Sequence, residues 1–443
     1  MSPCSGGLEH IAHHDMLTGL FNRHGLAERL DRALAQCDAG DSFAFHVIDL
    51  DRFKDVNDMY GHMVGDGMLK EVGARLRHAT RGEDVVARIG GDEFAVLQSG
   101  AATSAEASAM ATRIVDIIRQ PFETEGKVIE VGGRVGTALA PRHGTTREAL
   151  LRAADLALWS AKSGGGRSTR EYAPEMSEAV QHRRALEADL AKALAGGEFE
   201  VHYQPIYSLA SRQVTGSEAL IRWRHPLKGL ISPAEFIPLA EETGLIAAIG
   251  RHVVRVACAE AATWPDQMKI AVNLSPVQIR ADSVVEDICE ALEAAALAPS
   301  RLELEITETA LLRSDDRTRA RLDALEEMGI GMSMDDFGTG YSSLGYLRRF
   351  AFDKIKIDRS FVAEIGRSAD CRAIIQAITS LAASLGMTTT AEGIETAEQL
   401  AELTALGCTE GQGYLLARPM PASQLHAFLA EAARRPEAAA SAA

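Results

Sequence analysis

The stretch RGEDVVARIGGDEFAVL, residues 81–97, places two apolar runs on either side of two glycines and two acids. ARI and FAVL have the composition of β-strands, and Gly91-Asp92 fits a two-residue hairpin turn, in which glycine adopts a positive φ at little cost. Helical patterns surround this hairpin at residues 27–37, 67–80, 104–120 and 146–162, and further strand patterns lie at 43–51 and 127–140, the latter as a pair. The order of elements predicts an α+β domain with a mainly antiparallel sheet and helices packed on it.

The chain has 443 residues, which is more than one ordinary domain needs and enough for two. Its formal net charge of −16 argues against binding to nucleic-acid polymers or anionic membranes, so a phosphate site would need metals or a few placed basic groups. The six cysteines show no CxxC spacing, which favours reduced thiols. There is no membrane segment and no signal-peptide pattern, so we expect a cytoplasmic protein.

From Phe199 the pattern changes to a regular alternation of strands and helices. A hairpin-like start at 200–223 leads into strand patterns at 269–275, 301–309, 331–338, 353–358, 388–395 and 410–417, with helical patterns at 284–297, 317–329 and 373–386 between them. Repeated strand–helix units over such a length predict an α/β, TIM-like (β/α)8 barrel.

The segment 173–197, between the two halves, is predicted to be a helical linker. Leu186, Leu190 and Leu194 recur every four residues and form an apolar stripe along it. We expect the stripe to pack on the second domain, and a signalling or dimerisation helix is the alternative. These patterns place the first domain at 8–172 and the second at 198–435.

Polar residues lie in or directly after most strands of the second half. They are Glu218, Asn273, Glu305, Asp335, Asp336, Lys356 and Glu392. A barrel gathers the C-terminal ends of its strands at one mouth, so we expect these side chains to meet there. Carboxylate and amide oxygens suit Mg²⁺ or Mn²⁺ better than zinc, and five carboxylates need cations to stay ionised in one pocket.

This set of residues predicts a two-metal site for in-line attack of water at phosphorus, with Lys356 orienting the water or stabilising charge. Each residue also has a simpler explanation. A strand-end acid is often solvated or salt-bridged, and Asp335 or Asn273 could cap the following helix. Such a simple explanation can hold for any one of these residues, but it is much less expected to hold for all seven.

Residues 186–428 resemble the EAL-type phosphodiesterases, which cut cyclic di-GMP to the linear dinucleotide pGpG. The resemblance is carried, in the family's order and spacing, by YQPIYSL, GSEALIRW, SPAEFIPLAEETG, NLS, ELEITE, DDFGTGYSSL, KIKID, AEGIET and QGYLLARP. It implies that the metal ligands are Glu218, Asn273, Glu305, Asp335, Asp336 and Glu392. It further implies that Lys356 holds the attacking water, with Glu218 and Glu392 also in the catalytic set.

The same resemblance implies four supporting roles. Glu308 would stabilise the DDFGTG loop, and Glu395 would be a supporting acid outside the ligand set. Gln204 and Arg222 would contact the substrate. No catalytic position departs from the family pattern, which argues against a barrel that only binds.

A second group of polar residues accompanies the hairpin in the first half. Asp49 ends the strand pattern 43–51, so Asp49 and a hairpin acid could form a two-carboxylate Mg²⁺ site for a nucleotide. Asp66 could accept from both N1–H and N2–H of guanine, and Asn57 could pair with other edge atoms, a combination that adenine does not match. Asn57 and Asp66 could equally cap helices.

Residues 15–167 resemble the GGDEF-type diguanylate cyclases, which join two GTP molecules into cyclic di-GMP. The matching stretches are DMLTGLFNRHGL, IDLDRFKDVNDMYGHMVGDGML, RIGGDEFAVL and ADLALWSAK. The resemblance implies metal binding by Asp49 and Asp92, with Asp92 also activating the 3′-hydroxyl and Glu93 as its neighbouring acid. It implies guanine contacts by Asn57 and Asp66.

For the phosphates, the resemblance implies backbone N–H groups in a loop at Phe53 and Lys54, and a basic pair of Lys162 and Arg167. The family usually runs AKxxGRN, whereas this chain reads AKSGGGRS. Arg167 is therefore displaced by one residue. The stretch from Arg81 to Asp84 resembles the family's RxxD product-inhibition site, and the alternative is an exposed turn whose Arg–Asp pair has little energetic value.

Together the two resemblances imply cyclic di-GMP and GTP as ligands and Mg²⁺ or Mn²⁺ as the cofactor. They imply a homodimer, because diguanylate synthesis needs two GGDEF domains face to face. The favoured function is a cyclic di-GMP phosphodiesterase that also carries a cyclase domain. The alternatives are a phosphodiesterase with a silent, GTP-sensing GGDEF domain and a receptor in which neither site turns over.

Overall fold

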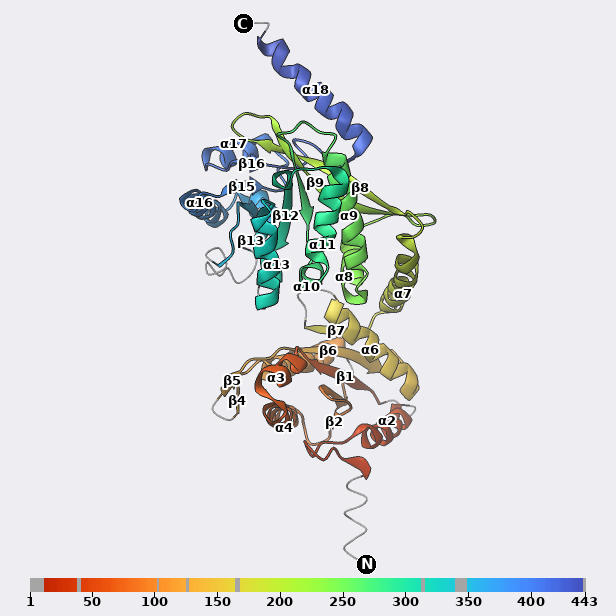
Figure 1. The fold of residues 1–443 in the computed structure, drawn as a ribbon. Helices are drawn as coiled ribbons and strands as arrows, with labels where there is room; N and C mark the ends of the chain where they lie inside the picture. Colours follow the sequence, from red (N-terminus) through yellow and green to blue (C-terminus); the bar gives the residue numbers. More distant parts are fainter. Residues whose placement is uncertain are drawn as a thin grey trace, which may run out of the picture. The chain divides into compact units, whose positions relative to one another are not determined.

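The computed structural model describes residues 12–37, 41–101, 103–124, 127–163, 168–311, 315–338 and 349–440. Contacts within the chain divide it into two compact units, Met1–Arg184 and Ala185–Ala443, each of which is described by itself below (Figure 1). The division falls inside helix α7 (Glu175–Ala193), within the segment predicted to be the linker. None of the helices in the described ranges is both long and apolar enough to cross a membrane.

The first unit is built on a five-stranded sheet with the order β2–β3–β1–β6–β7. Its strands are β1 (Phe43–Leu50), β2 (Val85–Arg88), β3 (Glu93–Ser99), β6 (Gly133–Ala140) and β7 (Thr169–Glu171). All neighbours are antiparallel except β6 and β7, which are parallel. The predicted α+β domain with a mainly antiparallel sheet is confirmed.

Helices cover both faces of this sheet, because the side chains of β1 alternate between two apolar layers. Phe45 and Val47 pack with α2 (Arg23–Cys37) and α6 (Arg147–Ser163), whereas Ile48 packs with α4 (His62–Ala79) and α5 (Ser104–Ile118). A short helix, α3 (Phe53–Tyr60), follows β1 directly. With both faces apolar, the polar residues at the ends of β1 and β3 are left at the edge of the core.

Two details differ from the sequence-based expectations. The two strands expected within 127–140 do not pair with each other, because β5 (Lys127–Ile129) pairs with β4 (Phe122–Thr124) while β6 joins the main sheet beside β1. Phe53 and Lys54 do not lie in a loop but form the first turn of α3. The reason is Arg52, whose φ of 57° turns the chain straight from β1 into the helix.

The second unit contains a closed ring of eight strands in its described part, in the order β9–β11–β12–β13–β14–β15–β16–β8 and back to β9. They are β8 (Phe199–Ser208), β9 (Val214–His225), β11 (Lys269–Asn273), β12 (Leu302–Thr307), β13 (Gly331–Phe337), β14 (Lys354–Ile357), β15 (Thr388–Ala391) and β16 (Glu410–Gly411). Neighbours from β9 to β16 are parallel, and β8 is antiparallel to both β9 and β16. The TIM-like barrel is confirmed, and its first strand belongs to the predicted hairpin.

Helices surround this barrel, except that α18 (Ala422–Ala440) extends beyond it (Figure 1). They are α8 (Pro233–Thr243), α9 (Ile246–Ala261), α10 (Pro276–Arg280), α11 (Val284–Ala295), α12 (Glu308–Leu311), α13 (Asp316–Glu327), α15 (Arg359–Glu364), α16 (Ala369–Ser384), α17 (Ala397–Ala405) and α18 (Ala422–Ala440). Two short strands, β10 (Gly229–Ile231) and β17 (Met420–Pro421), extend the sheet at β9 and β8. Leu186 and Leu190 of α7 are buried in the barrel's apolar core, and Leu194 packs against it, as the leucine stripe predicted.

The interior of the barrel is polar in two successive layers, because residues two apart on a strand share one face. In the layer toward the N-terminal ends of the parallel strands, Lys354 pairs with Glu303 at 2.9 Å and with Glu410 at 2.8 Å. Two residues further along β14 and β12, Lys356 and Glu305 occupy the layer toward the mouth. The second layer forms the candidate site of this unit.

Candidate active sites

In the first unit, the hairpin acids lie beside the end of β1. The antiparallel register sets Asp49 opposite Glu93, and the N–H of Leu50 donates to the carbonyl oxygen of Asp92 at 3.4 Å. Burial raises the pKa of Asp49, and the negative charges of Asp92 and Asp51 raise it further, while Lys162 acts against them. The two acids expected to share a metal are therefore close enough to feel each other's charge.

The turn itself differs from the expected geometry. The N–H groups of Ile89 and Gly90 both donate to the carbonyl oxygen of Glu93, so Gly91 and Asp92 form the tip as predicted. Neither glycine has a positive φ, however. A β-carbon on Gly90 would come within 2.8 Å of the end of the Glu93 side chain, which can move, and a β-carbon on Gly91 would meet nothing within 4 Å.

Arg88, the last residue of β2, holds this tip in place. Its Nη2 donates to the carbonyl oxygen of Gly91 at 2.8 Å, and its Nη1 contacts Oδ1 of Asp15 at 3.2 Å. Asp15 in turn accepts from the N–H and the hydroxyl of Thr18. The segment that precedes α2 therefore supports the turn from outside the sheet.

Lys162 reaches Asp49 from the last turn of α6. Its Nζ lies 2.5 Å from Oδ2 of Asp49. Arg134 of β6 fixes this end of the helix by donating to the carbonyl oxygens of Ala161 and Lys162 and to Oδ1 of Asp51. Arg167, the other predicted phosphate ligand, lies outside the described residues.

Asn57 and Asp66 come from two consecutive helices. Asn57 lies on α3, and its Oδ1 would be 2.0 Å from a β-carbon on Gly65, the residue before Asp66 on α4. The N-cap positions of these helices are Arg52 and Gly61, so neither Asn57 nor Asp66 is a helix N-cap. The structure thus brings the Asn57 side chain next to the turn that carries Asp66, which is exposed.

The RxxD segment forms a tight turn before β2. Oδ2 of Asp84 accepts from the N–H of Arg81 at 2.8 Å, and Oδ1 accepts from the N–H of Ser99 at 3.0 Å. The side chain of Arg81 is exposed. A pocket of about 730 Å³ adjoins this turn and is lined by Arg29, Arg32 and Glu83 among others. Asp84 therefore builds the turn, and the basic side chains nearby are those of Arg81 and of Arg29 and Arg32 on α2, with Arg29 lying over the Phe21 ring.

In the barrel, four carboxylates surround one buried lysine. Nζ of Lys356 lies 2.6 Å from Glu392, 2.7 Å from Glu305, 3.4 Å from Asp335 and 3.7 Å from Glu218. The lysine side chain is 1% exposed. These residues come from five different strands or strand ends, so the barrel gathers them as the strand-end pattern predicted.

Two side-chain amides fix the carboxylate of Glu218. Nδ2 of Asn273 donates to Oε1, and Nε2 of Gln412 donates to Oε2, both at 2.7 Å. Asn273 is not a helix cap, because Ser275 is the N-cap of α10 and its hydroxyl accepts from the N–H of Gln278. Gln412 also donates to Glu392 at 3.3 Å.

Gln412 was missing from the residues predicted for this site. It follows β16 directly, just as Glu392 follows β15, and it is 4% exposed. The same rule, a polar residue after a strand, would have found it in the stretch QGYLLARP. The strand is only two residues long, and this makes the signal weak.

Asp335 and Asp336 occupy an irregular part of β13. The register with β14 shifts between Met334 and Phe337, and Asp336 has a φ of 56°, a left-handed conformation unusual for a residue with a side chain. The N–H of Asp336 donates to Oδ1 of Asp335 at 3.0 Å. In a regular strand two successive side chains point to opposite faces, so the bulge is what changes the direction of the second one.

The buried charges of this cluster shift one another's pKa values. Burial raises the pKa of Glu392 to about 7, with Asp335 and Glu218 adding to the effect of burial and Lys356 opposing it. Burial also raises the pKa of Glu305 well above its usual range. For Glu218, burial acts upward, but Lys356 and the amides of Gln412 and Asn273 outweigh it, and its pKa is lowered.

These residues fit divalent metal ions. One ammonium cannot neutralise four buried carboxylates, and a cluster with this excess of negative charge needs further cations to stay ionised. Oε1 of Glu305 is buried and has no hydrogen-bond partner among the described residues. Buried carboxylate oxygens are normally satisfied, so this oxygen is suited to a ligand such as Mg²⁺ or Mn²⁺.

The four supporting residues are distributed around this cluster. Gln204 is on β8, opposite Glu218 of β9, and its side chain donates to the carbonyl oxygen of Ala417. Arg222 is half-buried and lies further along β9. Both oxygens of Glu308 are buried without a partner in the described ranges, and most of the loop it was predicted to stabilise lies outside them. Glu395 is exposed and has no hydrogen bond or ion pair with the cluster in the described part of the chain, so its supporting role stays a prediction.

Each of the two units matches a known family of protein domains. Residues 187–419 match the family model of the EAL domain. The chain belongs to the EAL domain family. Residues 12–168 match the model described as diguanylate cyclase, GGDEF domain, so the chain is a tandem GGDEF–EAL protein.

Relatives share both domains. The chain is 43% identical to the bifunctional diguanylate cyclase/cyclic di-GMP phosphodiesterase MucR of Pseudomonas aeruginosa, over 95% of this chain and 62% of MucR. It is 37% identical to the cyclic di-GMP phosphodiesterase PdeR of Escherichia coli, over 93% of this chain and 62% of PdeR. The chain thus spans less than two thirds of the length of these curated relatives, and about half of others.

Among solved structures, the EAL domain is similar to the PaMucR phosphodiesterase in complex with c-di-GMP. The two are 45% identical with a TM-score of 0.53, and the match covers 54% of this chain and 99% of the other. The EAL enzyme Bd1971 with cAMP and cyclic di-GMP bound is also similar, with 28% identity and a TM-score of 0.55. This match covers 68% of this chain and 82% of the other. The comparison therefore supports the barrel fold.

Proposed function

We propose that this protein hydrolyses cyclic di-GMP to pGpG at the mouth of its EAL barrel. The observation that carries the proposal is the cluster of Glu218, Glu305, Asp335 and Glu392 around Lys356. Support comes from relatives whose names describe cyclic di-GMP phosphodiesterases and from the PaMucR structure with c-di-GMP. The domain limits of 8–172 and 198–435, with a linker between them, are part of the proposal.

Two Mg²⁺ or Mn²⁺ ions would bind at this cluster. Their proposed ligands are Glu218, Asn273, Glu305, Asp335, Asp336 and Glu392. When bound, such ions lower the pKa of a coordinated water and offset the charge that develops on the leaving oxygen. Asn273 would need to turn from its bond with Glu218, which is a small rearrangement of one side-chain amide.

The protein's own groups then orient the reaction. Lys356, fixed by at least two short contacts with Glu305 and Glu392, would hold the attacking water by donating to its oxygen. Gln412 keeps Glu218 in one orientation through its amide. Gln204 and Arg222, on the neighbouring strands β8 and β9, would bind the dinucleotide beside the cluster. The bond broken is one P–O3′ ester, and water supplies the new oxygen on phosphorus.

The test is a direct assay of the purified full chain with cyclic di-GMP and Mn²⁺ or Mg²⁺, with products separated by chromatography. We expect pGpG from the wild type, none from Glu218→Ala, and normal amounts from Glu293→Ala, which removes an exposed acid on α11. Cyclic di-GMP that stays intact with both metals would overturn the proposal, provided circular dichroism shows that the protein is folded.

A second activity is proposed for the GGDEF domain, which would bind GTP–Mg²⁺ and join two GTP molecules into cyclic di-GMP. The observation in favour is the convergence of Asp49, Asp92 and Lys162 at one end of the sheet. Asn57 and Asp66 would contact guanine, and Lys162 with Arg167 would contact the phosphates. Glu93 would be the second acid of the turn. A homodimer is required, because one domain holds only one GTP.

This second activity is tested in the Glu218→Ala background, where product cannot be degraded. Cyclic di-GMP formed from GTP, lost on adding Asp92→Ala but not on adding Asp116→Ala, an exposed acid on α5, would support the cyclase. GTP binding without product at high protein concentration would instead support the GTP-sensing alternative. Addition of cyclic di-GMP to an active sample, with and without Arg81→Ala, tests whether the RxxD turn inhibits synthesis.

A further inference from the structure

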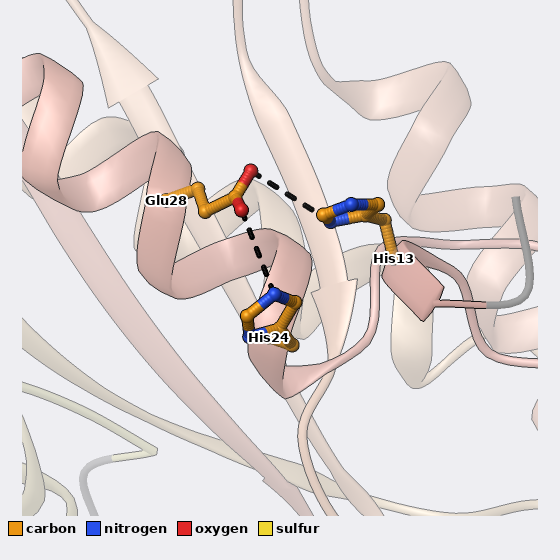
Figure 2. Close-up of side chains that lie close together, drawn as sticks. All are labelled: His13, His24 and Glu28. Atoms are coloured by element: carbon orange, nitrogen blue, oxygen red, sulfur yellow. Dashed lines mark ion pairs between the residues drawn. The ribbon is translucent and has the colours of Figure 1, made fainter. Parts of the chain in front are cut away.

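A group of three potential metal ligands lies at the start of α2, away from both sites described above. Figure 2 shows the His13 and His24 rings turned toward the carboxylate of Glu28. His24 and Glu28 are four residues apart on α2 and therefore share one face of the helix. The three ligand atoms all lie within 4.8 Å of one another.

The separations match shared ligands better than hydrogen bonds. Nδ1 of His13 lies 3.7 Å from Oε2 of Glu28, and Nε2 of His24 lies 3.5 Å from Oε1. A hydrogen bond between such atoms would be about 2.7–3.2 Å long. Two ligands of one tetrahedral zinc ion, each about 2.0–2.1 Å from the metal, lie roughly 3.4 Å apart. The two measured separations end on different oxygens of Glu28, and one ligand atom from each of the three residues lies within 4.8 Å of the other two.

The position of His13 is fixed by its backbone rather than by its ring. Its carbonyl oxygen accepts from the N–H of Asn22, and the Asn22 side chain donates to the carbonyl oxygen of Ala12 at 2.9 Å. Oδ1 of Asn22 accepts from the N–H of Gly25 at 2.9 Å, so the same residue anchors the helix start. A β-carbon on Gly25 would lie 2.4 Å from the His13 carbonyl oxygen, which shows how closely this segment approaches α2.

The two imidazole rings are stacked. Their centroids are 5.1 Å apart with an interplanar angle of 29°. Within the ranges that the structure describes, neither ring has a hydrogen bond to another residue. Both rings and Glu28 are accessible from solvent, so an ion can enter.

We propose that His13, His24 and Glu28 form a binding site for a divalent transition-metal ion of the Zn²⁺ class. Two imidazole nitrogens and one carboxylate favour Zn²⁺, Co²⁺ or Cu²⁺ over Mg²⁺, which prefers oxygen ligands. The fourth position is open to water. The site differs in this chemistry from the all-oxygen carboxylate and amide cluster of the barrel.

Metal at this site would restrain the segment that supports the hairpin turn. Asp15 lies two residues after His13 and pairs with Arg88, which donates to Gly91 at the turn tip. An ion shared by His13 and α2 fixes the start of that segment. We therefore expect Zn²⁺ to slow amide hydrogen exchange in residues 12–22.

The test uses the full chain without a histidine tag, in excess Mg²⁺ so that oxygen-rich sites are filled. Co²⁺ is added and its visible absorption recorded, because tetrahedral cobalt with histidine ligands absorbs far more strongly than six-coordinate cobalt in an oxygen site. The variants are His13→Gln, His24→Gln and Glu28→Gln. His78→Gln is the matched control, since this exposed histidine on α4 lies outside the group.

We expect one strongly absorbing Co²⁺ per chain, displaced by Zn²⁺, with affinity reduced at least about tenfold in each of the three variants and unchanged in His78→Gln. Zinc should slow exchange in residues 12–22 of the wild type but not of His24→Gln. The same Co²⁺ spectrum and affinity in wild type and in the combined His24→Gln, Glu28→Gln variant would overturn the proposal, as would no binding to the wild type. All three residues are partly or largely exposed, and melting without metal checks that the variants remain folded.

Discussion

Lys354 and Lys356 lie two residues apart on β14, both point into the barrel, and each contacts carboxylates of neighbouring strands. Lys354 has two such partners, Glu303 and Glu410, whereas Lys356 has four. With every carboxylate ionised, the first group has one negative charge in excess and the second has three. This difference separates a structural ion-pair group from a site that needs further cations.

The two lysines therefore respond differently to metal. Lys356→Met removes the one ammonium that contacts the four carboxylates in the described ranges, and we expect a loss of about 3–5 kcal/mol in the free energy of unfolding when metal is chelated. Mn²⁺ should restore much of this loss, because it supplies the missing positive charge. Lys354→Met should lower the free energy of unfolding by a similar amount, and Mn²⁺ should not restore this loss. Thermal melting with chelator and with Mn²⁺ measures both, and equal responses of the two variants would contradict the assignment of the metal site.

Gln412 supports the site through hydrogen bonds to Glu218 and Glu392. Gln412→Leu removes these donors while keeping a side chain of similar size, and we expect Mn²⁺ affinity and phosphodiesterase kcat to fall about 10–100-fold. Stability should change little, since the variant also removes the buried, unpaired Oε1 of Gln412. Calorimetric Mn²⁺ titration measures the effect. Gln376→Ala, on the exposed face of α16, is the control, and wild-type affinity in Gln412→Leu would refute this role.

Because Asp336 has a left-handed backbone, substitutions there can separate an effect on stability from an effect on metal binding. Both Asp336→Gly and Asp336→Ala remove a proposed ligand, so both should weaken Mn²⁺ binding. Glycine adopts a φ of 56° without strain, whereas alanine does not, and we expect the glycine variant to be the more stable of the two by about 1 kcal/mol.

Ala296→Gly provides the control for this comparison. Ala296 has a φ of 50° at the end of α11, outside the site, so the change should relieve strain without altering metal binding. Chemical denaturation ranks the stabilities. An alanine variant as stable as the glycine variant would show that the strained backbone is not maintained in solution.

His46 makes the first unit sensitive to acid. The ring is fully buried, with Nδ1 2.9 Å from the Thr137 hydroxyl and Nε2 3.2 Å from Oε1 of Gln98, and burial lowers its pKa to about 4. The unfolded chain has a histidine pKa near 6.5, so between pH 6.5 and 4 the unfolded state binds the proton and the folded state does not. Stability is therefore full above this window and falls as the pH is lowered through it, by roughly 3 kcal/mol in total.

Hydrogen exchange of β1, corrected for the intrinsic pH dependence, measures this loss. His46→Gln should flatten the profile between pH 6.5 and 4, because it removes the titrating group. His62→Gln, which changes an exposed histidine on α4, should leave the profile as in the wild type. A steep profile in His46→Gln would assign the acid sensitivity to other groups.

Much of this protein could be inferred from sequence because its polar residues follow apolar strands in a regular order. The strand-end pattern found Glu218, Glu305, Asp335, Lys356 and Glu392, and the barrel does bring them together. It missed Gln412, since a two-residue strand leaves almost no pattern. It also misjudged the glycines of the hairpin, because neither Gly90 nor Gly91 adopts the positive φ that glycine allows in such a turn.

The sequence by itself determined the two fold classes, the order of the domains and the residue types at the barrel mouth, since these follow from local periodicity and from which residues end each strand. Only the tertiary structure decided that Lys356 has four carboxylate partners, that a bulge turns Asp336 out of the strand alternation, and that Arg88 ties Asp15 to the turn. It also decided that His13 approaches His24 and Glu28. Each of these depends on the closure of a ring or the crossing of a segment over a helix, and distances across such contacts are not encoded in local spacing.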